Sequence, residues 1–409
     1  MKLFQIASEA NIGSIGIIAE HIGQIVLSRG GESYIAYGRS HRESKSKLIK
    51  IGSFPGVIIH GLMTRLFDMH GLGSTRATKE LIRAIERIEP DILHLHHLHG
   101  YYINIKILFD FISKSNIPIV WTFHDCWSFT GHCCYFDRID CNKWISGCYA
   151  CPQKKNYPAS YFLDRSKKNY DLKKNLFTSV KNLTIVTPSK WLEKLVKNSF
   201  FQGYPVFTIH NGVDLTLFKP IQDRENIRKI FGVENKFVIL GVAKPFNERK
   251  GFSDFLRLSE RLKEDEIIIL VGLDETQIKK LPSNIIGIKK TDNRKKLAEL
   301  YSASDLFMNP TWEDNFPTTN LEALACGTPV ATYNTGGSIE AVDQDTGFII
   351  EKGSISGLIE AIKLVKNKGK EFYSGACRRR AEKYFDKEKQ LLKYLDVYKS
   401  VLKGGFSDG

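Results

Sequence analysis

The sequence predicts an α/β protein of two doubly wound domains, each a parallel sheet with helices on both faces. Its 409 residues are too many for one ordinary hydrophobic core and favour two domains of about 200 residues each. Short apolar strands alternate with helical patterns in both halves of the chain, which is typical of parallel sheets. An Asn211-Gly212 turn signal follows the strand expected at Val206 to Ile209, near the middle of the sequence.

The first strand is expected at residues 2–7 and leads through a glycine-rich turn, Asn11 to Gly16, into a helix that ends at Arg29. Such a turn between a strand and a helix can hold a phosphate, although this one lacks the complete G-x-G-x-x-G pattern. A second strand follows at Ser33 to Tyr37, and a helix at Thr78 to Ile88 carries its apolar residues on one face.

Two further strands of the first half end in polar residues. The strand that begins near Pro90 runs into a loop with four histidines, which are His94, His96, His97 and His99. The next strand, Ile117 to Phe123, delivers His124 and Asp125 to the same edge, where ligands bind in open α/β sheets. Such a pair can hydrogen-bond substrate hydroxyls, and a histidine can exchange a proton near neutral pH. The alternatives are a metal site, which strand alternation opposes, and histidines satisfied in the core.

The rest of the first half continues the strand and helix alternation. A strand at Leu183 to Thr187 is followed by an amphipathic helix that opens at Pro188 to Trp191. Between this strand and Asp125 lies an insertion, at about residues 126–180, that is rich in cysteine and basic residues.

The second half repeats the pattern. A strand at Phe237 to Val242 precedes the turn Asn247 to Gly251, where Arg249 and Lys250 bring two cations toward a phosphate. The remaining elements are expected in the order strand Glu266 to Gly272, helix Arg294 to Ser302, strand Asp305 to Asn309, strand Val330 to Tyr333, turn Thr335 to Ser338, strand Phe348 to Ile350 and helices near 355–366 and 370–402. Asp343 and Asp345 resemble a metal-binding pair, but they lie in a turn and are interpreted as turn residues.

The segment Asn309 to Val330 contains no Lys or Arg but three acids, which are Glu313, Asp314 and Glu322. Its prolines predict a loop, and Thr318 to Cys326 then predicts a helix that Gly327 and Pro329 end. The backbone N–H groups at the helix start, those of Phe316, Thr318 and Thr319, suit a diphosphate. The carboxylates beside them can accept hydrogen bonds from sugar hydroxyls. The alternative is a surface loop that leads into an ordinary amphipathic helix.

This segment resembles the E-x7-E donor-site motif of the family 4 glycosyltransferases. Asp314 is followed by seven residues, by Glu322 and then by Ala-Leu-Ala-Cys-Gly-Thr-Pro-Val. Family 4 enzymes retain anomeric configuration and have the GT-B fold, two Rossmann-like domains that face a central cleft. Asp314 replaces the first Glu of the motif and is one methylene shorter, so the neighbouring Glu313 could share its role.

The resemblance assigns roles to residues of both halves. Donor-binding residues would be Lys244, Arg249, Lys250, Glu313, Phe316, Pro317, Thr318 and Glu322. Asp314 would hold the transferred sugar, Glu322 the ribose hydroxyls, and His124 would project toward the sugar. The acceptor side would include Gly13, Ser14, Gly16, His97, His99 and Asp125. Ile17 stands where the family often has a basic residue.

The resemblance also implies the domain boundaries. The first domain would cover 1–207 and bind the acceptor, and the second, at 208–385, would bind the nucleotide-sugar. The segment His210 to Pro220 would be the passage between them, and a helix at 386–409 would cross back to the first domain.

Within family 4, the chain resembles the bacterial group that builds colanic acid, capsule or O-antigen on a membrane-bound lipid diphosphate. The implied reaction transfers a sugar from a nucleotide donor to a hydroxyl of a growing glycan, with retention. In the implied front-face mechanism the leaving diphosphate accepts the acceptor's proton, without a catalytic cofactor. The sequence does not specify whether the donor is a UDP or a GDP sugar, or which sugar it carries.

Charge and hydropathy bear on location. The net charge is +14, and residues 151–200 alone carry 11 Lys and Arg against 3 Asp and Glu. Aromatic residues lie among these cations, so the block is either a solvated face or a surface that docks on anionic lipid. No apolar run reaches about 18 residues and no signal-peptide pattern is present. We expect a cytoplasmic protein, peripheral on the inner face of the cytoplasmic membrane, with a lipid-linked glycan as its acceptor.

Two other classes of protein are alternatives to a transferase. A nucleic-acid-binding protein would explain the charge and the Cys/His content, but not a second nucleotide-type domain. A nucleotide-sugar isomerase needs a redox dinucleotide fingerprint, and a phosphorylase needs a lysine-linked cofactor site. The sequence shows neither signature, and no nucleic-acid partner is expected.

Four of the eight cysteines are spaced C-x7-C-x6-C-x2-C in the insertion, at Cys133, Cys141, Cys148 and Cys151, with His132 beside the first. A long segment with few aliphatic residues needs something to order it, and a structural zinc ion held by thiolates can do so. The alternative is that these cysteines are reduced thiols packed beside Trp127 and Trp144.

Overall fold

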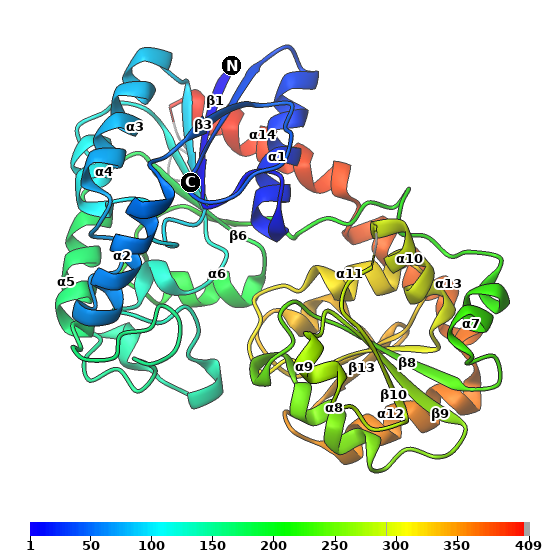
Figure 1. The fold of residues 1–409 in the computed structure, drawn as a ribbon. Helices are drawn as coiled ribbons and strands as arrows, with labels where there is room; N and C mark the ends of the chain where they lie inside the picture. Colours follow the sequence, from blue (N-terminus) through cyan, green and yellow to red (C-terminus); the bar gives the residue numbers. More distant parts are fainter. Residues whose placement is uncertain (292, 405–409) are drawn as a thin grey trace. The chain divides into compact units, whose positions relative to one another are not determined.

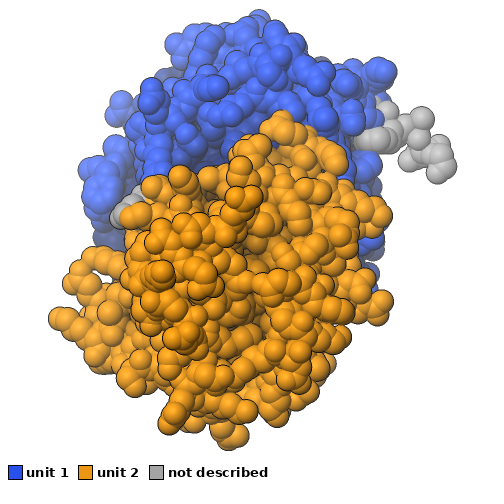
Figure 2. All heavy atoms as spheres, turned by 90° about the vertical axis from the view of Figure 1, so that its right-hand side faces the viewer, with its two compact units in different colours: residues 1–209, 391–409 blue, residues 210–390 orange. Residues whose placement is uncertain are grey.

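The computed structural model describes residues 1–291 and 293–404. The chain forms two compact units (Figure 2). The first contains residues 1–209 and the chain from Leu391 onward, and the second contains residues 210–390.

Within the described residues, the first unit contains a seven-stranded parallel sheet of order β3-β2-β1-β4-β5-β6-β7. Its strands are β1 (Lys2–Ala7), β2 (Glu32–Tyr37), β3 (Lys47–Lys50), β4 (Ile92–Leu95), β5 (Ile119–Thr122), β6 (Leu183–Thr187) and β7 (Val206–Thr208). The strand order reverses between β1 and β4, and ligands bind outside the carboxyl ends of the strands near such a point.

Helices cover both faces of this sheet (Figure 1). They are α1 (Gly13–Ser28), α2 (Phe54–Phe67), α3 (Thr75–Ile88), α4 (Ile105–Ile112), α5 (Ser166–Phe177) and α6 (Lys190–Lys197). Alternate residues of each strand enter different cores: Leu3 and Val120 pack with α1, whereas Phe4 and Trp121 pack with α3, α4 and α5. This alternation follows from the two-residue period of a strand and explains why the strands are apolar on both faces.

The second unit contains, in its described part, a six-stranded parallel sheet of order β10-β9-β8-β11-β12-β13. Its strands are β8 (Phe237–Val242), β9 (Glu266–Val271), β10 (Ile285–Ile288), β11 (Leu306–Asn309), β12 (Val330–Tyr333) and β13 (Gly347–Ile350). Its helices are α7 (Arg224–Phe231), α8 (Phe252–Ser259), α9 (Glu275–Ile278), α10 (Arg294–Ala303), α11 (Thr318–Ala325), α12 (Ile355–Lys368) and α13 (Lys370–Tyr384). The predicted fold class, two doubly wound parallel domains, is confirmed.

The prediction of a single helix near 370–402 is wrong, because the chain breaks between α13 and α14 (Lys387–Leu402). At the break, the Val213 N–H donates to the Phe385 carbonyl at 2.8 Å and the Lys387 N–H donates to the Val213 carbonyl at 3.1 Å. A Cβ on Gly212 would lie 2.4 Å from Lys387 Cα, so only glycine permits this approach. These bonds replace the helical ones that residues 385–387 would otherwise make.

The later part of α14 packs on the first unit beside α1 (Figure 1). Leu391, Leu395 and Tyr398 join the core formed by Leu3 and Ile22. The Tyr398 hydroxyl also lies 2.6 Å from His94 Nδ1, and both side chains are buried. A core histidine of β4 thus fixes the C-terminal helix.

The insertion after β5 is irregular over residues 123–165, all of which the structure describes. It contains the short 3-10 helices η1 (Trp127–Phe129), η2 (Asp137–Ile139) and η3 (Lys143–Ile145). Residues 166–177 of the predicted insertion instead form α5, which places Phe177 in the main core. Within the irregular part, the rings of Phe129, Phe136 and Trp144 pack together at centroid distances of 5.1–6.4 Å.

Candidate active site

The acidic segment forms the loop between β11 and α11, with Asp314 in the loop and Glu322 in the second turn of the helix. Pro317 precedes the first helical residue, and no side chain caps the N–H groups of the first turn. These groups and the positive end of the helix dipole favour an anion at Thr318. The loop therefore places a carboxylate beside the N–H groups of a helix start, and phosphate binding there stays a prediction.

A buried network of amides and hydroxyls holds α11 in place. Asn320 accepts a hydrogen bond from Asn309 Nδ2 at 2.8 Å and donates to the carbonyl and hydroxyl of Ser338, each at 3.1 Å. All three residues are buried. Sequence analysis did not assign them a role, because a single Asn inside a helical pattern carries no distinct signal. The network ties the helix start to the end of β11 and to the turn after β12.

Two predicted donor residues meet directly, because the Lys250 ammonium contacts the Asp314 carboxylate. Their side chains are only 19% and 12% exposed. Burial lowers the pKa of Lys250, and Asp314 opposes that shift. The adjacent Arg249 donates from Nη1 to the Glu313 carbonyl at 2.8 Å. The turn after β8 is thus bound to the acidic loop by both of its cations.

Two glycines permit this close approach. Gly251 has φ +76°, and a Cβ there would lie 2.3 Å from the Pro310 carbonyl oxygen. Gly336 has φ +51°, and a Cβ there would lie 1.9 Å from the Asp314 carbonyl oxygen. The left-handed backbone and the lack of space both require glycine, so these positions fix the loop around Asp314.

Glu322 lies apart from the ion pair and is held by other partners. Its Oε2 accepts a hydrogen bond from the Tyr301 hydroxyl at 3.1 Å, and Arg294 lies 3.9 Å from its Oε1. Burial raises the pKa of Glu322 to about 7. Tyr301 was missed by sequence analysis, since its position in α10 fits an ordinary core residue.

Of the remaining predicted donor residues, all but Lys244 belong to the same loop or to the start of α11. Glu313 is buried and supplies its carbonyl to Arg249. Phe316 is buried against the ring of His210 at a centroid distance of 4.8 Å, and its carbonyl accepts from Asn211 Nδ2 at 3.0 Å. Lys244 follows β8, at the carboxyl edge of the same sheet. The interpretation of Asp343 as a turn residue is confirmed, because its Oδ1 accepts from the Thr346 hydroxyl at 2.7 Å.

In the first unit, two of the predicted histidines converge on Asp125. His97 Nε2 and His99 Nε2 lie 3.1 and 2.8 Å from the same carboxylate oxygen, Oδ2. The other oxygen accepts from the Trp127 N–H at 2.9 Å. Burial acts to raise the pKa of Asp125, but His99 and His97 outweigh it and hold that pKa well below its usual range. Asp125 is therefore an ionised acceptor, with His99 also bound to the Tyr157 hydroxyl at 3.1 Å.

His124 belongs to a second chain of contacts. Its Nε2 lies 3.2 Å from His96 Nδ1, and His96 Nε2 lies 3.1 Å from Gln5 Oε1. Burial, reinforced by His96 and His97, lowers the pKa of His124 well below its ordinary value. A neutral imidazole follows, which can exchange hydrogen bonds with a hydroxyl but would not neutralise a phosphate.

A metal site was the alternative interpretation of the four histidines. Two of them, His94 and His96, instead have protein side chains as hydrogen-bond partners. His97, His99 and Asp125 form the only group in the described chain that brings three possible ligand atoms within 4.8 Å of one another. The same three side chains suit the binding of a substrate hydroxyl as well as they suit a metal ion.

The glycine-rich turn forms the first turn of α1, with Gly13, Ser14 and Gly16 inside the helix. A Cβ on Gly13 would lie 2.7 Å from the Glu9 carboxylate, so an acidic side chain crosses this turn. An anion there would meet like charge, and the turn therefore fits an uncharged hydroxyl-bearing group better than a phosphate.

The fold is that of a two-domain enzyme of the GT-B type, with paired cations beside a helix start in one α/β unit and histidines around a carboxylate in the other. Family models match both halves: Glycosyltransferase Family 4 at residues 25–217 and Glycosyl transferases group 1 at residues 223–384. The chain belongs to the glycosyltransferases of this family 4 type.

Relatives agree with this assignment. The chain is 24% identical, over 89% of its length and 90% of the relative's, to WcaC of Escherichia coli K12, provisionally named a colanic acid biosynthesis glycosyl transferase. It is 26% identical over half its length, and 57% of the relative's, to an E. coli UDP-Gal:alpha-D-GlcNAc-diphosphoundecaprenol alpha-1,3-galactosyltransferase. The Anabaena HepE structure with UDP and glucose shares the fold, with a TM-score of 0.70 and 16% identity over 98% of this chain and 100% of that one.

Replacing Lys250 by alanine tests the anion site. We expect kcat/KM to fall by roughly 30- to 1,000-fold, or about 2–4 kcal/mol, the usual loss for one preorganised charge-stabilising group. Lys289→Ala, which removes an exposed lysine of the same unit, should leave turnover unchanged. Near-normal kcat/KM in a folded Lys250→Ala variant would contradict the assignment.

The raised pKa of Glu322 predicts that nucleotide affinity depends on pH. Above a pH of about 7 the carboxylate can accept hydrogen bonds from ribose hydroxyls, and below it the protonated group accepts less well. Affinity should therefore fall as pH decreases through about 7, by at most about tenfold per pH unit for one proton. Titration calorimetry of UDP and GDP can measure this. Glu322→Gln should lack the step, and an identical pH profile in that variant would argue against Glu322 as its source.

Proposed function

We propose that the protein transfers a sugar from a nucleoside diphosphate sugar to a hydroxyl group of a lipid-linked glycan, with retention of configuration, during surface polysaccharide synthesis. The observation that carries the proposal is the contact of Lys250 and Arg249 with residues 313 and 314 of the loop that leads into α11, the helix that bears Glu322. This arrangement offers cations and N–H groups to a diphosphate and carboxylates to two sugars.

Each donor residue receives a role from its chemistry. Lys250, Arg249 and the N–H groups of α11 neutralise the diphosphate as the bond between the sugar and its leaving oxygen breaks. Asp314 accepts hydrogen bonds from the transferred sugar and Glu322 from the ribose. The leaving diphosphate takes the proton of the attacking hydroxyl, so no side chain is needed as a base. Charge stabilisation and positioning then supply most of the acceleration.

The histidine group of the first unit is proposed to bind sugar hydroxyls. The ionised Asp125 and the imidazoles of His124 and His99, whose pKa values burial lowers, offer acceptors and donors to hydroxyl groups, with His97 beside them. Retention is supported by the galactosyltransferase relative, whose name gives an alpha linkage formed from UDP-Gal. The same name, with its diphosphoundecaprenol acceptor, supports a lipid diphosphate acceptor for this chain.

A membrane surface is proposed as the place of action. Six apolar residues of α2, which are Phe54, Ile58, Ile59, Leu62, Leu66 and Phe67, are 40–75% exposed. Tyr161, Phe162 and Leu163 are 49–70% exposed, and the Tyr161 N–H donates to the Arg65 carbonyl at the end of α2 at 2.8 Å. The two segments together form the α2 apolar surface, and an apolar surface of this kind marks an interaction site.

Basic residues of the same unit favour anionic lipid as the partner. Exposed lysines lie on and beside the segment that bears Phe162, at Lys155, Lys167, Lys168 and Lys174. No helix in the described part of the chain is both long and apolar enough to cross a membrane. The 14 residues of α2 instead suit a helix that lies in the lipid interface. We propose that the protein is peripheral on the inner face of the cytoplasmic membrane, where a lipid-linked acceptor would be found.

The reaction is tested with a panel of UDP and GDP sugars and a short sugar linked to a polyprenyl diphosphate. We expect one donor to give a lengthened glycan whose new linkage has the anomeric configuration of the donor, as measured by NMR. Formation of an altered nucleotide-sugar with no change in the acceptor would overturn the proposal. An inverted linkage would overturn the retaining mechanism.

The division of roles between the two carboxylates gives a separate prediction. Glu322→Ala should weaken binding of the donor and of the free nucleotide alike, because ribose is common to both. Asp314→Ala should reduce transfer more than nucleotide affinity. Calorimetry and initial rates measure the two effects, and equal losses of bare nucleotide affinity would refute the division. If Glu313→Ala were the damaging change, the motif would be shifted by one residue.

The α2 apolar surface should be required for binding to anionic vesicles. Phe54→Ser combined with Phe162→Ser should reduce sedimentation with phosphatidylglycerol vesicles, whereas Phe372→Ser, at an equally exposed phenylalanine of the second unit, should not. Binding by the unaltered protein should also weaken with salt, because exposed charges are screened within about 8–10 Å at 0.1–0.15 M. Equal binding to neutral vesicles, or no effect of the double substitution, would contradict this.

A further inference from the structure

The insertion after β5 has an ordered, buried centre although it contains no β-strand and no α-helix between residues 123 and 165, a stretch the structure describes completely. Trp144, Phe136 and Cys133 are at most 8% exposed. Segments this long without regular structure need side-chain or ligand contacts to fix them. The source of order in this insertion therefore needs an explanation beyond its few aromatic contacts.

The four spaced cysteines face one small cavity. Cys133, Cys141, Cys148 and Cys151 all line it, together with His132 and Trp144 among others. Its volume is about 10 Å³, close to the space that one water-sized particle needs. Four cysteines that are 3 to 18 positions apart in the sequence thus line one space that suits a single ion.

The sulfur atoms also interact with one another and with the backbone. Cys133 and Cys151 share a hydrogen bond. The Gly131 N–H donates to Cys148 Sγ at 3.1 Å, and backbone donors of this kind support sulfurs that carry negative charge. The sulfurs do not lie within 4.8 Å of one another as a set, so binding an ion would draw them inward around the cavity.

One buried basic residue, Lys173, lies near the cysteines. The buried Lys173 ammonium donates to the carbonyls of Trp127 at 2.7 Å and Thr130 at 3.1 Å, and lies 3.5 Å from the centre of a Trp127 ring. Among the described residues, no carboxylate lies within ion-pair distance of it. A buried cation without a counter-charge is costly, and burial accordingly lowers the pKa of Lys173 to about 7. A metal ion bound by several thiolates carries net negative charge and would offset it.

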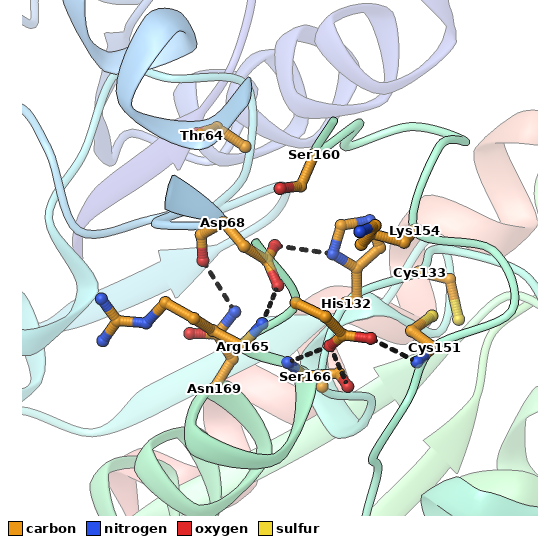
Figure 3. A network of polar contacts seen from close by, with 12 residues as sticks. Thr64, Asp68, His132, Cys133, Cys151, Lys154, Ser160, Arg165, Ser166 and Asn169 are labelled. Carbon is orange, nitrogen blue, oxygen red and sulfur yellow. Dashed lines mark hydrogen bonds and ion pairs between the residues drawn. The ribbon is translucent and has the colours of Figure 1, made fainter. Parts of the chain in front are cut away.

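His132 lies beside the cavity and is fixed by a buried carboxylate. Its Nδ1 lies 2.7 Å from Asp68 Oδ1, while Asp68 Oδ2 accepts from the Arg165 N–H at 2.7 Å (Figure 3). Its Nε2 is buried and has no hydrogen-bond partner in the structure. Carboxylate-bound histidines of this kind orient metal sites, which makes His132 the competing candidate for one ligand position.

We propose that this cavity binds one zinc ion through the thiolates of Cys133, Cys141, Cys148 and Cys151. Four sulfur ligands fill the tetrahedral shell of zinc, so the ion is structural and leaves no position open for a substrate. Its effect is to order the insertion, which carries Tyr157 to its contact with His99. This inference does not depend on the proposed reaction.

Metal analysis of the purified full-length protein tests the proposal. We expect about one zinc per chain, falling to about zero in Cys148→Ser and Cys151→Ser, whereas Cys377→Ala, at a buried thiol of the second unit, retains it. His132→Gln should also retain zinc. Loss of zinc in His132→Gln with retention in Cys141→Ser would overturn the four-cysteine ligand set.

A second measurement does not rely on variants that could fail to fold. Alkylation of the native protein, mapped by mass spectrometry, should label the half-buried Cys141, Cys148 and Cys151 slowly until a chelator removes the metal, and rapidly afterwards. Replacement by Co²⁺ should give the visible absorption of a tetrahedral thiolate complex. Rapid labelling before chelation, or a Cys133–Cys151 disulfide in place of a metal, would overturn the proposal.

Discussion

The buried contact between Lys250 and Asp314 is the interaction on which the donor site depends. It joins the turn after β8 to the loop before α11, and Arg249 makes a second connection to the same loop. Two opposite charges that are mostly removed from water stabilise each other only when both are present, and removing one leaves the other buried without compensation. Gly251 and Gly336 make the approach sterically possible. The pair therefore shapes the loop as well as supplying charge, and a diphosphate would compete with Asp314 for the same ammonium.

The candidate site residues of the two units differ in charge. Residues 301–350 contain seven acids and no base, so Lys250, Arg249 and a helix start must supply the positive potential for a diphosphate. In the first unit, burial keeps His124 and His99 below their ordinary pKa values, while Asp125 remains ionised. Such a group can bind hydroxyls but does not attract phosphate strongly. Under the proposed function, this contrast would let one chain bind a charged donor and the hydroxyl groups of a sugar at separate groups of residues.

Much of the fold could be predicted because its strands are short, apolar and bounded by turn residues. The bounds of β6, β8 and β12 agree with the sequence pattern to the residue. The prediction failed where long-range contacts decide the local structure, as at Phe385, where hydrogen bonds from Val213 and Lys387 interrupt the helix pattern. Helix α2 was missed because Pro55, Gly56 and Gly61 disfavour a helix and because its apolar residues face solvent. A pattern search for helices with a buried apolar face cannot reveal a helix whose apolar face is exposed.

The residues of the candidate site also fall into those that the sequence could predict and those that it could not. The acidic motif and the paired cations lie in contiguous segments, so their types and spacing could be recognised. Tyr301, Asn320 and Tyr157 could not, because each acts through a neighbour that is distant in sequence or that looks like an ordinary core position. The roles proposed for the carboxylates and for the zinc ligands remain predictions.

The most direct test of this account is the structure of the full-length protein bound to a nucleoside diphosphate. The account predicts that Lys250 Nζ leaves the Asp314 carboxylate and lies within about 2.7–3.2 Å of a phosphate oxygen, with the diphosphate at the start of α11 and the ribose against Glu322. A diphosphate bound elsewhere, with the contact between Lys250 and Asp314 intact, would contradict it.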